Sequence, residues 1–168
     1  IKQGFNTGVD HAGVEIGQPT AFFVGGALNL NPNDPQAEIK NLRRKIRAGV
    51  DFFLTQPIYA VGPAQAFIER ARQEVEGFTT PVLVGLLPLA SDRHAIFLHH
   101  EVPGIEIPES IQKRMTAAGE NGAQTGIEIA QELAGEMHEF SQGVYLMPAF
   151  NRFDYAAEII EGICRNVG

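Results

Sequence analysis

Gln56 is the residue whose type and position first suggest chemistry. It follows the apolar run Phe52 to Leu54 and directly precedes Pro57. An apolar run bounded by turn residues is typical of a strand buried on both faces of a parallel sheet. Proline has no N–H to donate to a neighbouring strand, so the strand is expected to end there. This places Gln56 at the carboxyl end of a strand, where α/β proteins bind their ligands.

The side chain of a glutamine presents a carbonyl acceptor beside an amide donor. This pair is complementary to a ligand edge that shows N–H beside C=O, as a pterin, a flavin or a purine does. The alternative is that Gln56 only satisfies the backbone of a loop, and from its position both interpretations are open.

Two further groups of polar residues have the chemistry to bind anions. Arg152 follows the last expected strand and can hold a carboxylate or phosphate through two parallel hydrogen bonds. It can equally form an exposed ion pair with Asp154, which would contribute little stability. A basic run from Asn41 to Arg47 lies on an expected helix, and it is either a solvated face or a grip on phosphates.

The composition is that of an ordinary globular domain, with 44% apolar and 20% charged residues among 168. The net charge of −7 disfavours nucleic acid and anionic membranes as partners, and no segment approaches the roughly 20 apolar residues of a membrane span. The single cysteine, Cys164, cannot form an intrachain disulfide, which predicts a reducing, cytoplasmic location. The five histidines show no zinc spacing, so no metal is expected.

Strands and helices that alternate along the chain would position these residues. Strands are expected at residues 20–30, 51–58, 81–89 and 144–150, and helices at about 35–48, 63–77, 109–118, 122–139 and 153–164, with a short helix after Ser91. This order predicts an α/β fold with parallel β/α units and right-handed crossovers.

Four strands do not close a (β/α)8 barrel, which usually takes about 250 residues. The chain is therefore expected to be a single domain, residues 1–168, that forms half a barrel or a small open sheet. A half barrel leaves two strand edges and an apolar inner face uncovered, so we expect a homo-oligomer.

Several stretches, in order and at matching spacing, resemble the methylenetetrahydrofolate reductase family: RRKIRAGVDFFLTQPIY, PVLVGLLPL, FLHHEVPGIEIPE, GIEIAQELAGE and GVYLMPAFNR. The opening GVDHAGVEIGQPTAFFVGGALN is most similar to the reductase domain of bifunctional proteins that also carry a homocysteine S-methyltransferase. The resemblance covers about residues 3–163. It implies the C-terminal half of a (β/α)8 TIM barrel, the last four β/α units, with FAD at the carboxyl ends of the strands.

The resemblance also implies a reaction, the reduction of 5,10-methylenetetrahydrofolate to 5-methyltetrahydrofolate by NAD(P)H through FAD. Gln56 corresponds to the glutamine that hydrogen-bonds the folate pterin, and Arg152 to an arginine at the glutamate tail of the folate. The residues that match FAD-binding positions of the family are Asn31, Glu38, Asn41, Arg44 and Lys45. Asn31 differs in type from the histidine that some members have there.

The resemblance places the acid glutamate of the family and its flavin-facing aspartate before Ile1. We therefore expect no catalytic residue in this chain and no activity from the 168 residues alone, because the reaction needs an acid and a tuned flavin. Two other functions stay open. One is a non-catalytic half barrel that binds a pterin or nucleotide and pairs with another chain, and the other is a pterin-dependent methyltransferase-type barrel without flavin.

Overall fold

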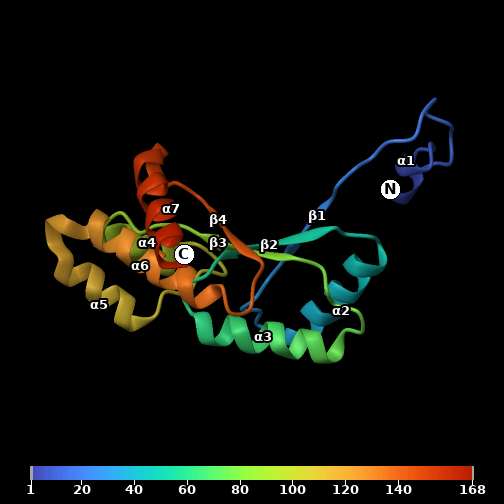
Figure 1. Ribbon diagram of the computed structural model, residues 1–168. Helices are drawn as coiled ribbons and strands as arrows, with labels where there is room; N and C mark the ends of the chain where they lie inside the picture. The colour runs from blue at the N-terminus through green and yellow to red at the C-terminus, as the bar shows by residue number, and fades with distance from the viewer. Residues whose placement is uncertain (1, 168) are drawn as a thin grey trace.

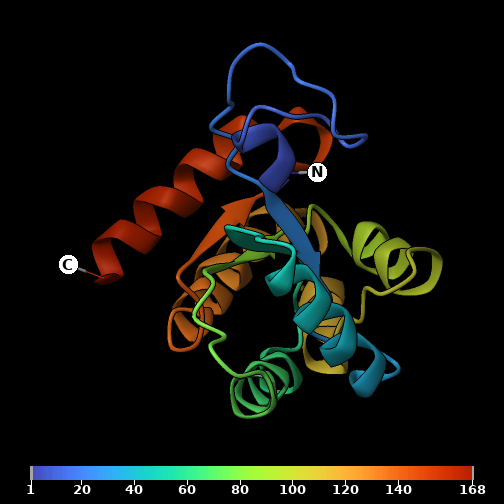
Figure 2. The ribbon, with the colours of Figure 1, turned by 90° about the vertical axis from the view of Figure 1, so that its right-hand side faces the viewer.

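A parallel sheet with helices on one face organises the chain. The computed structural model describes residues 2–167. Its strands β1 (Gly25–Leu28), β2 (Phe52–Pro57), β3 (Val82–Leu86) and β4 (Gly143–Leu146) are all parallel and lie side by side in that order (Figure 1). Helices α2 (Pro35–Arg47), α3 (Val61–Glu74) and α6 (Gly122–Met137) lie together on one side of the strands, as the view in Figure 2 shows. The predicted α/β half barrel is confirmed.

The remaining elements extend this unit. Helices α4 (Asp92–Glu101) and α5 (Glu109–Ala118) and the short 3-10 helix η1 (Gly119–Asn121) connect β3 to α6. A second 3-10 turn, η2 (Ala149–Asn151), follows β4 and leads into α7 (Phe153–Val167), which packs on α6. Of the helices in residues 2–167, none has the length and apolar character needed to cross a bilayer.

The ends of α2 follow from its own residues. Asp34 caps the helix by accepting a hydrogen bond from the Ala37 N–H at 3.0 Å, and Pro35 occupies the first turn, where no N–H is needed. Gly49 follows the helix with φ +81°, a left-handed conformation that glycine adopts without a steric cost. These bounds agree with the predicted ones to within one residue.

The strands are shorter than predicted. β3 ends at Leu86 and not at residue 89, because Pro88 cannot donate to a ladder. β4 ends at Leu146, and the 3-10 turn η2 (residues 149–151) overlaps the end of the predicted strand. Residues 20–24 lie outside β1, and the start of the chain contains the short helix α1 (Lys2–Asn6).

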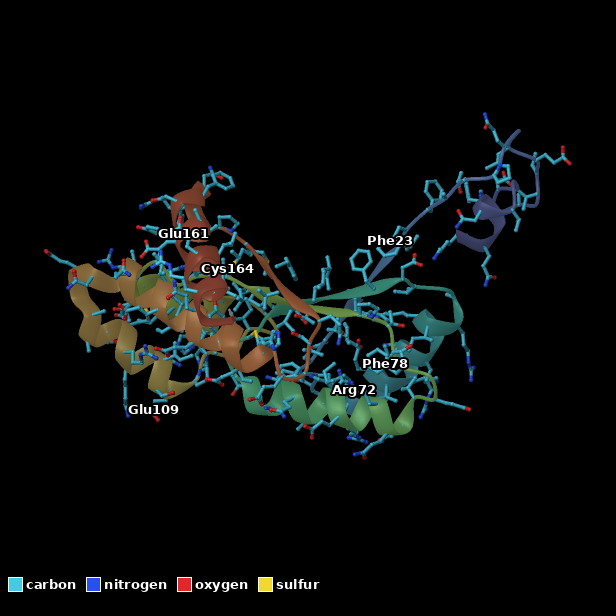
Figure 3. All side chains as sticks on the ribbon, in the orientation of Figure 1. Phe23, Arg72, Phe78, Glu109, Glu161 and Cys164 are labelled. Atoms are coloured by element: carbon cyan, nitrogen blue, oxygen red, sulfur yellow. The ribbon has the colours of Figure 1, made fainter. Side chains whose placement is uncertain are left out.

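The two faces of the sheet differ in burial. Phe53 is fully buried on the helix side, with its ring edge-on to Phe78 at 6.1 Å. Its neighbour Phe52 points to the opposite face and stacks on Phe23 at 5.2 Å. Phe23 is 75% exposed, and Figure 3 shows it on the other side of the strands from Phe78. The inner face of the half barrel is therefore apolar and open.

The N-terminal segment is held to the sheet by one polar cluster. Lys2 donates to the Gly49 carbonyl at 2.9 Å and forms an ion pair with Asp51 at 2.5 Å. Asp51 in turn accepts a hydrogen bond from the Val24 N–H at 2.6 Å, just before β1. Beyond this cluster α1 and the following loop project away from the sheet (Figure 1).

Helix α6 approaches the turn after β3 more closely than a side chain would allow. A Cβ added at Gly126 would lie 1.7 Å from the Leu89 carbonyl oxygen, and one at Gly122 would lie 3.2 Å from the Ser91 Cα. The backbones are therefore in direct contact, and this contact fixes the start of α4 relative to α6.

We expect Gly126→Ala to destabilise the protein by about 2 kcal/mol or more, because the added methyl group forces α6 away from Leu89. The free energy of unfolding in urea measures the effect. Gly135→Ala is the matched control, since a Cβ at Gly135 on the same helix meets nothing within 4 Å. That variant is expected to gain roughly 0.5–1 kcal/mol from helix propensity, and equal effects of the two substitutions would contradict the packing described.

Candidate functional site

Two cavities open at the edge where the strands end. The first has a volume of about 420 Å³ and is lined by Ala27, Leu28, Asn29, Glu38, Lys45, Leu54, Thr55, Gln56 and Tyr145; we call it the Gln56 cavity. The second has a volume of about 510 Å³ and is lined by Leu87, Ser91, Arg93, His94, Phe97, Ala149 and Phe150; we call it the His94 cavity. Both volumes are in the range of small-molecule sites.

Gln56 carries a polar atom that the described residues leave without a partner. Its side-chain Oε1 is buried and accepts no hydrogen bond. A buried acceptor without a donor typically costs about 1–3 kcal/mol, and such atoms are rare in folded proteins. Gln56 is among the residues that line the cavity, so a ligand N–H would satisfy this acceptor once the amide turns toward the cavity.

The opposite wall of this cavity is charged but internally paired. Lys45 Nζ donates to the Ala27 carbonyl of β1 at 2.5 Å and lies 3.5 Å from Glu38 Oε1. The same Glu38 oxygen accepts the Asn29 N–H at 3.3 Å. Helix α2 thus contacts the edge strand through Glu38 and Lys45, which lie on the same face of the helix. Their opposite charges offset each other.

Asn41 and Arg44 lie elsewhere on α2. They line a hollow of about 310 Å³ together with Lys40, Arg43 and Arg47. Arg44 donates to Asn41 Oδ1 at 3.3 Å, whereas Arg43 is turned toward α3 and donates to the Glu74 carbonyl at 2.7 Å. The hollow is strongly basic and suits an anion.

Asn31 is separate from both groups. Its side-chain amide donates to Glu106 Oε2 at 3.0 Å, and it lines a small hollow formed with residues 57–60, Gly104 and Glu106. Asn31 does not line the Gln56 cavity. Asn29, two residues earlier, lines it instead.

Arg152 forms the ion pair that the sequence offered as an alternative. Its guanidinium donates to both oxygens of Asp154, at 2.9 and 2.5 Å, and lies 3.8 Å from the centre of the Tyr155 ring. The hydrogen bond from Arg152 lowers the pKa of the Asp154 carboxyl. The pair is exposed, and Arg152 lines neither of the two cavities.

One comparison with known proteins shows the family, and another shows a similar fold. A family model described as methylenetetrahydrofolate reductase matches residues 19–164. The chain belongs to the methylenetetrahydrofolate reductase family. A solved structure of similar fold is an uncharacterized protein from Clostridium thermocellum that binds two copies of 5-methyl-5,6,7,8-tetrahydrofolic acid, with a TM-score of 0.63 and 17% sequence identity. The match covers 87% of this chain and 54% of that structure, so the chain spans about half its length.

The sequence patterns did not predict a site at His94. His94 Nδ1 accepts the Ala90 N–H at 3.2 Å, so the ring proton of the neutral imidazole is on Nε2. Burial lowers the pKa of His94, which favours that neutral form. The ring lies 5.1 Å from that of Phe150, whose backbone has left-handed φ 55° and ψ 30°. No sequence signal marks a left-handed phenylalanine, because the conformation is imposed by the turn after β4.

Thr55 and Tyr145 were also not assigned to the site by resemblance, although both line the Gln56 cavity. Tyr145 lies in the interior of an expected strand, where an aromatic residue is ordinary core. Among the described residues no group of three or more His, Cys, Asp or Glu side chains is placed to hold a metal ion.

Gln56→Met is expected to stabilise the free protein by about 1 kcal/mol, because methionine fills the same space without the unpaired acceptor. Thermal unfolding without ligand measures the change. The matched control is Gln142→Met, because Gln142 Oε1 accepts the Val82 N–H at 2.8 Å and its loss should lower stability. Destabilisation by Gln56→Met would show that its oxygen is satisfied in the folded protein.

Proposed function

We propose that this chain is the folate- and FAD-binding half of a methylenetetrahydrofolate reductase, which reduces 5,10-methylenetetrahydrofolate to 5-methyltetrahydrofolate with NAD(P)H. The family match over residues 19–164 supports the reaction class. The observation that carries the substrate assignment is the buried, unpartnered Oε1 of Gln56, a residue that lines a cavity at the strand ends. A pterin edge with N–H beside C=O would pair with both groups of that amide.

The residues of α2 fit a flavin dinucleotide. The hollow around Asn41 and Arg44 offers an amide and several cationic side chains to a pyrophosphate, and Lys45 and Glu38 stand at the adjacent Gln56 cavity. When bound, FAD would carry hydride from the nicotinamide cofactor to the folate. Asn31 and Arg152 stay proposed contacts, of FAD and of the folate tail, and each would have to leave its present partner, Glu106 or Asp154.

We assign no catalytic acid within this chain. Glu38 is the one carboxylate among the residues that line the Gln56 cavity, and it is engaged by Lys45 and the Asn29 N–H. Its role in the proposed function is to hold Lys45 and the end of β1 in place. The relation to bifunctional proteins and the cytoplasmic location both stay predictions.

A second function, a non-catalytic half barrel that pairs with another chain, is favoured by the open face of the sheet. Gly25 and Ala27 of the edge strand are exposed, and Phe23 stands uncovered beside them. Apolar surface of this kind favours association, which also supports the proposed homo-oligomer. The two functions differ in whether the protein binds FAD.

Gln56→Ala is expected to raise the Kd for 5-methyltetrahydrofolate by about tenfold or more, because the amide that pairs with the pterin is lost. Isothermal titration calorimetry with the wild-type protein and the variant measures it. Gln65→Ala, which removes an exposed glutamine paired with Glu69 on α3, is the control and should bind normally. An unchanged Kd in the Gln56 variant would remove the substrate assignment.

Arg44→Ala combined with Lys45→Ala is expected to weaken FAD binding by roughly 10- to 100-fold, because Arg44 would lose charge-assisted hydrogen bonds to the pyrophosphate and Lys45 would lose its contact with FAD from the adjacent cavity. The visible absorbance of flavin retained after gel filtration reports the loss. Lys113→Ala with Arg165→Ala removes the same charge from exposed pairs on α5 and α7 and should retain flavin. A wild-type protein that stays colourless after FAD is added would instead support the non-catalytic function.

A further inference from the structure

Strand β2 contains one residue more than β3 beside the Gln56 cavity. Leu54 is paired with Leu83 and Pro57 with Gly85, so three steps along β2 match two steps along β3. This is a β-bulge, a local distortion that re-aims side chains and is common next to binding sites. The residues within it are Thr55 and Gln56, so the bulge sets the direction of the Gln56 side chain.

At the bulge, where the ladder of backbone hydrogen bonds is interrupted, the hydroxyls of Thr55 and Tyr145 bond the backbone groups instead. The Gly85 N–H donates to Thr55 Oγ1 at 3.0 Å, and that hydroxyl donates to the Gln56 carbonyl at 2.7 Å. The carbonyl of Thr55 accepts a short hydrogen bond from the Tyr145 hydroxyl. Thr55 is 4% exposed and Gly85 is buried, so the Thr55 carbonyl and the Gly85 N–H would otherwise be buried without a partner.

Tyr145 reaches Thr55 from two strands away. It lies on β4, and its partner in register on β3 is Gly85. A Cβ on Gly85 would lie 2.8 Å from Met147 Cε and 3.0 Å from the carbonyl carbon and oxygen of Gln56. The missing side chain therefore allows the bulged backbone to sit close against β3. Burial raises the pKa of the Tyr145 phenol, which keeps it protonated as a donor.

We propose that Tyr145 is a positioning residue for substrate recognition: its hydroxyl, together with that of Thr55, holds the β2 bulge that places Gln56 at the cavity. The proposal rests on the proposed function, since it takes the folate pterin as the group that Gln56 reads. Tyr145 acts through Gln56, so its effect on binding should vanish when the Gln56 amide is absent.

A double-mutant cycle tests this dependence. Tyr145→Phe alone is expected to raise the Kd for 5-methyltetrahydrofolate by about tenfold, measured by calorimetry on the whole protein. In the Gln56→Ala background the same substitution should leave the Kd unchanged, because coupled residues are not additive. Independent, multiplying effects, or a Tyr145→Phe protein that binds like the wild type, would overturn the proposal.

Thr55 provides a second route that does not alter the tyrosine. Thr55→Val removes the hydroxyl at nearly constant shape and should weaken binding as Tyr145→Phe does, whereas Thr55→Ser keeps the hydroxyl and should restore it. If valine and serine bind equally, the bulge does not aim Gln56.

Tyr59→Phe controls for the general cost of losing a tyrosine hydrogen bond. The Tyr59 hydroxyl donates to the Leu87 carbonyl at 2.7 Å, so its removal should lower the melting temperature without changing the Kd. An equal rise in Kd for Tyr59→Phe would overturn the specific role of Tyr145. If Gln56→Ala itself leaves the Kd unchanged, the substrate assignment fails as well, whereas an inert Tyr145→Phe beside an active Gln56→Ala removes only the positioning role.

Discussion

Because β1 to β4 run parallel and carry α2, α3 and α6 on one face, the carboxyl ends of the four strands meet at one edge of the sheet. Asn29, Gln56 and Tyr145 are far apart in sequence and become neighbours around one cavity there. The same topology leaves Ala27 exposed and its neighbour in register, Leu54, partly exposed on the opposite face. The candidate site and the open inner face of the half barrel are two results of one arrangement.

The Gln56 cavity combines satisfied and unsatisfied polar groups. Lys45 and Glu38 are bound to each other and to the backbone in and just after β1. They hold this wall of the cavity in place, and neither charge is left unpaired. Gln56 Oε1 is left buried without a donor. A polar atom that is kept at a cost to stability indicates a binding role more strongly than a polar atom that the fold already satisfies.

Glycine determines how closely the elements around the site approach one another. Gly126 lets α6 contact the turn after β3, and Gly85 lets the bulged part of β2 lie against β3. The first contact places α4, which bears His94, and the second places Gln56. Both cavities therefore depend on backbone contacts that any larger residue would block.

Local sequence patterns predict the order of the elements, the bounds of α2, the position of Gln56 at a strand end, and the family. These depend on interactions within a few residues, such as the Asp34 cap, the Gly49 stop and the missing N–H of Pro57. The contacts of Asn31 with Glu106 and of Tyr145 with Thr55 follow from the packing of distant segments. Such contacts depend on strand register, which a single bulged residue shifts, and no local pattern encodes that register.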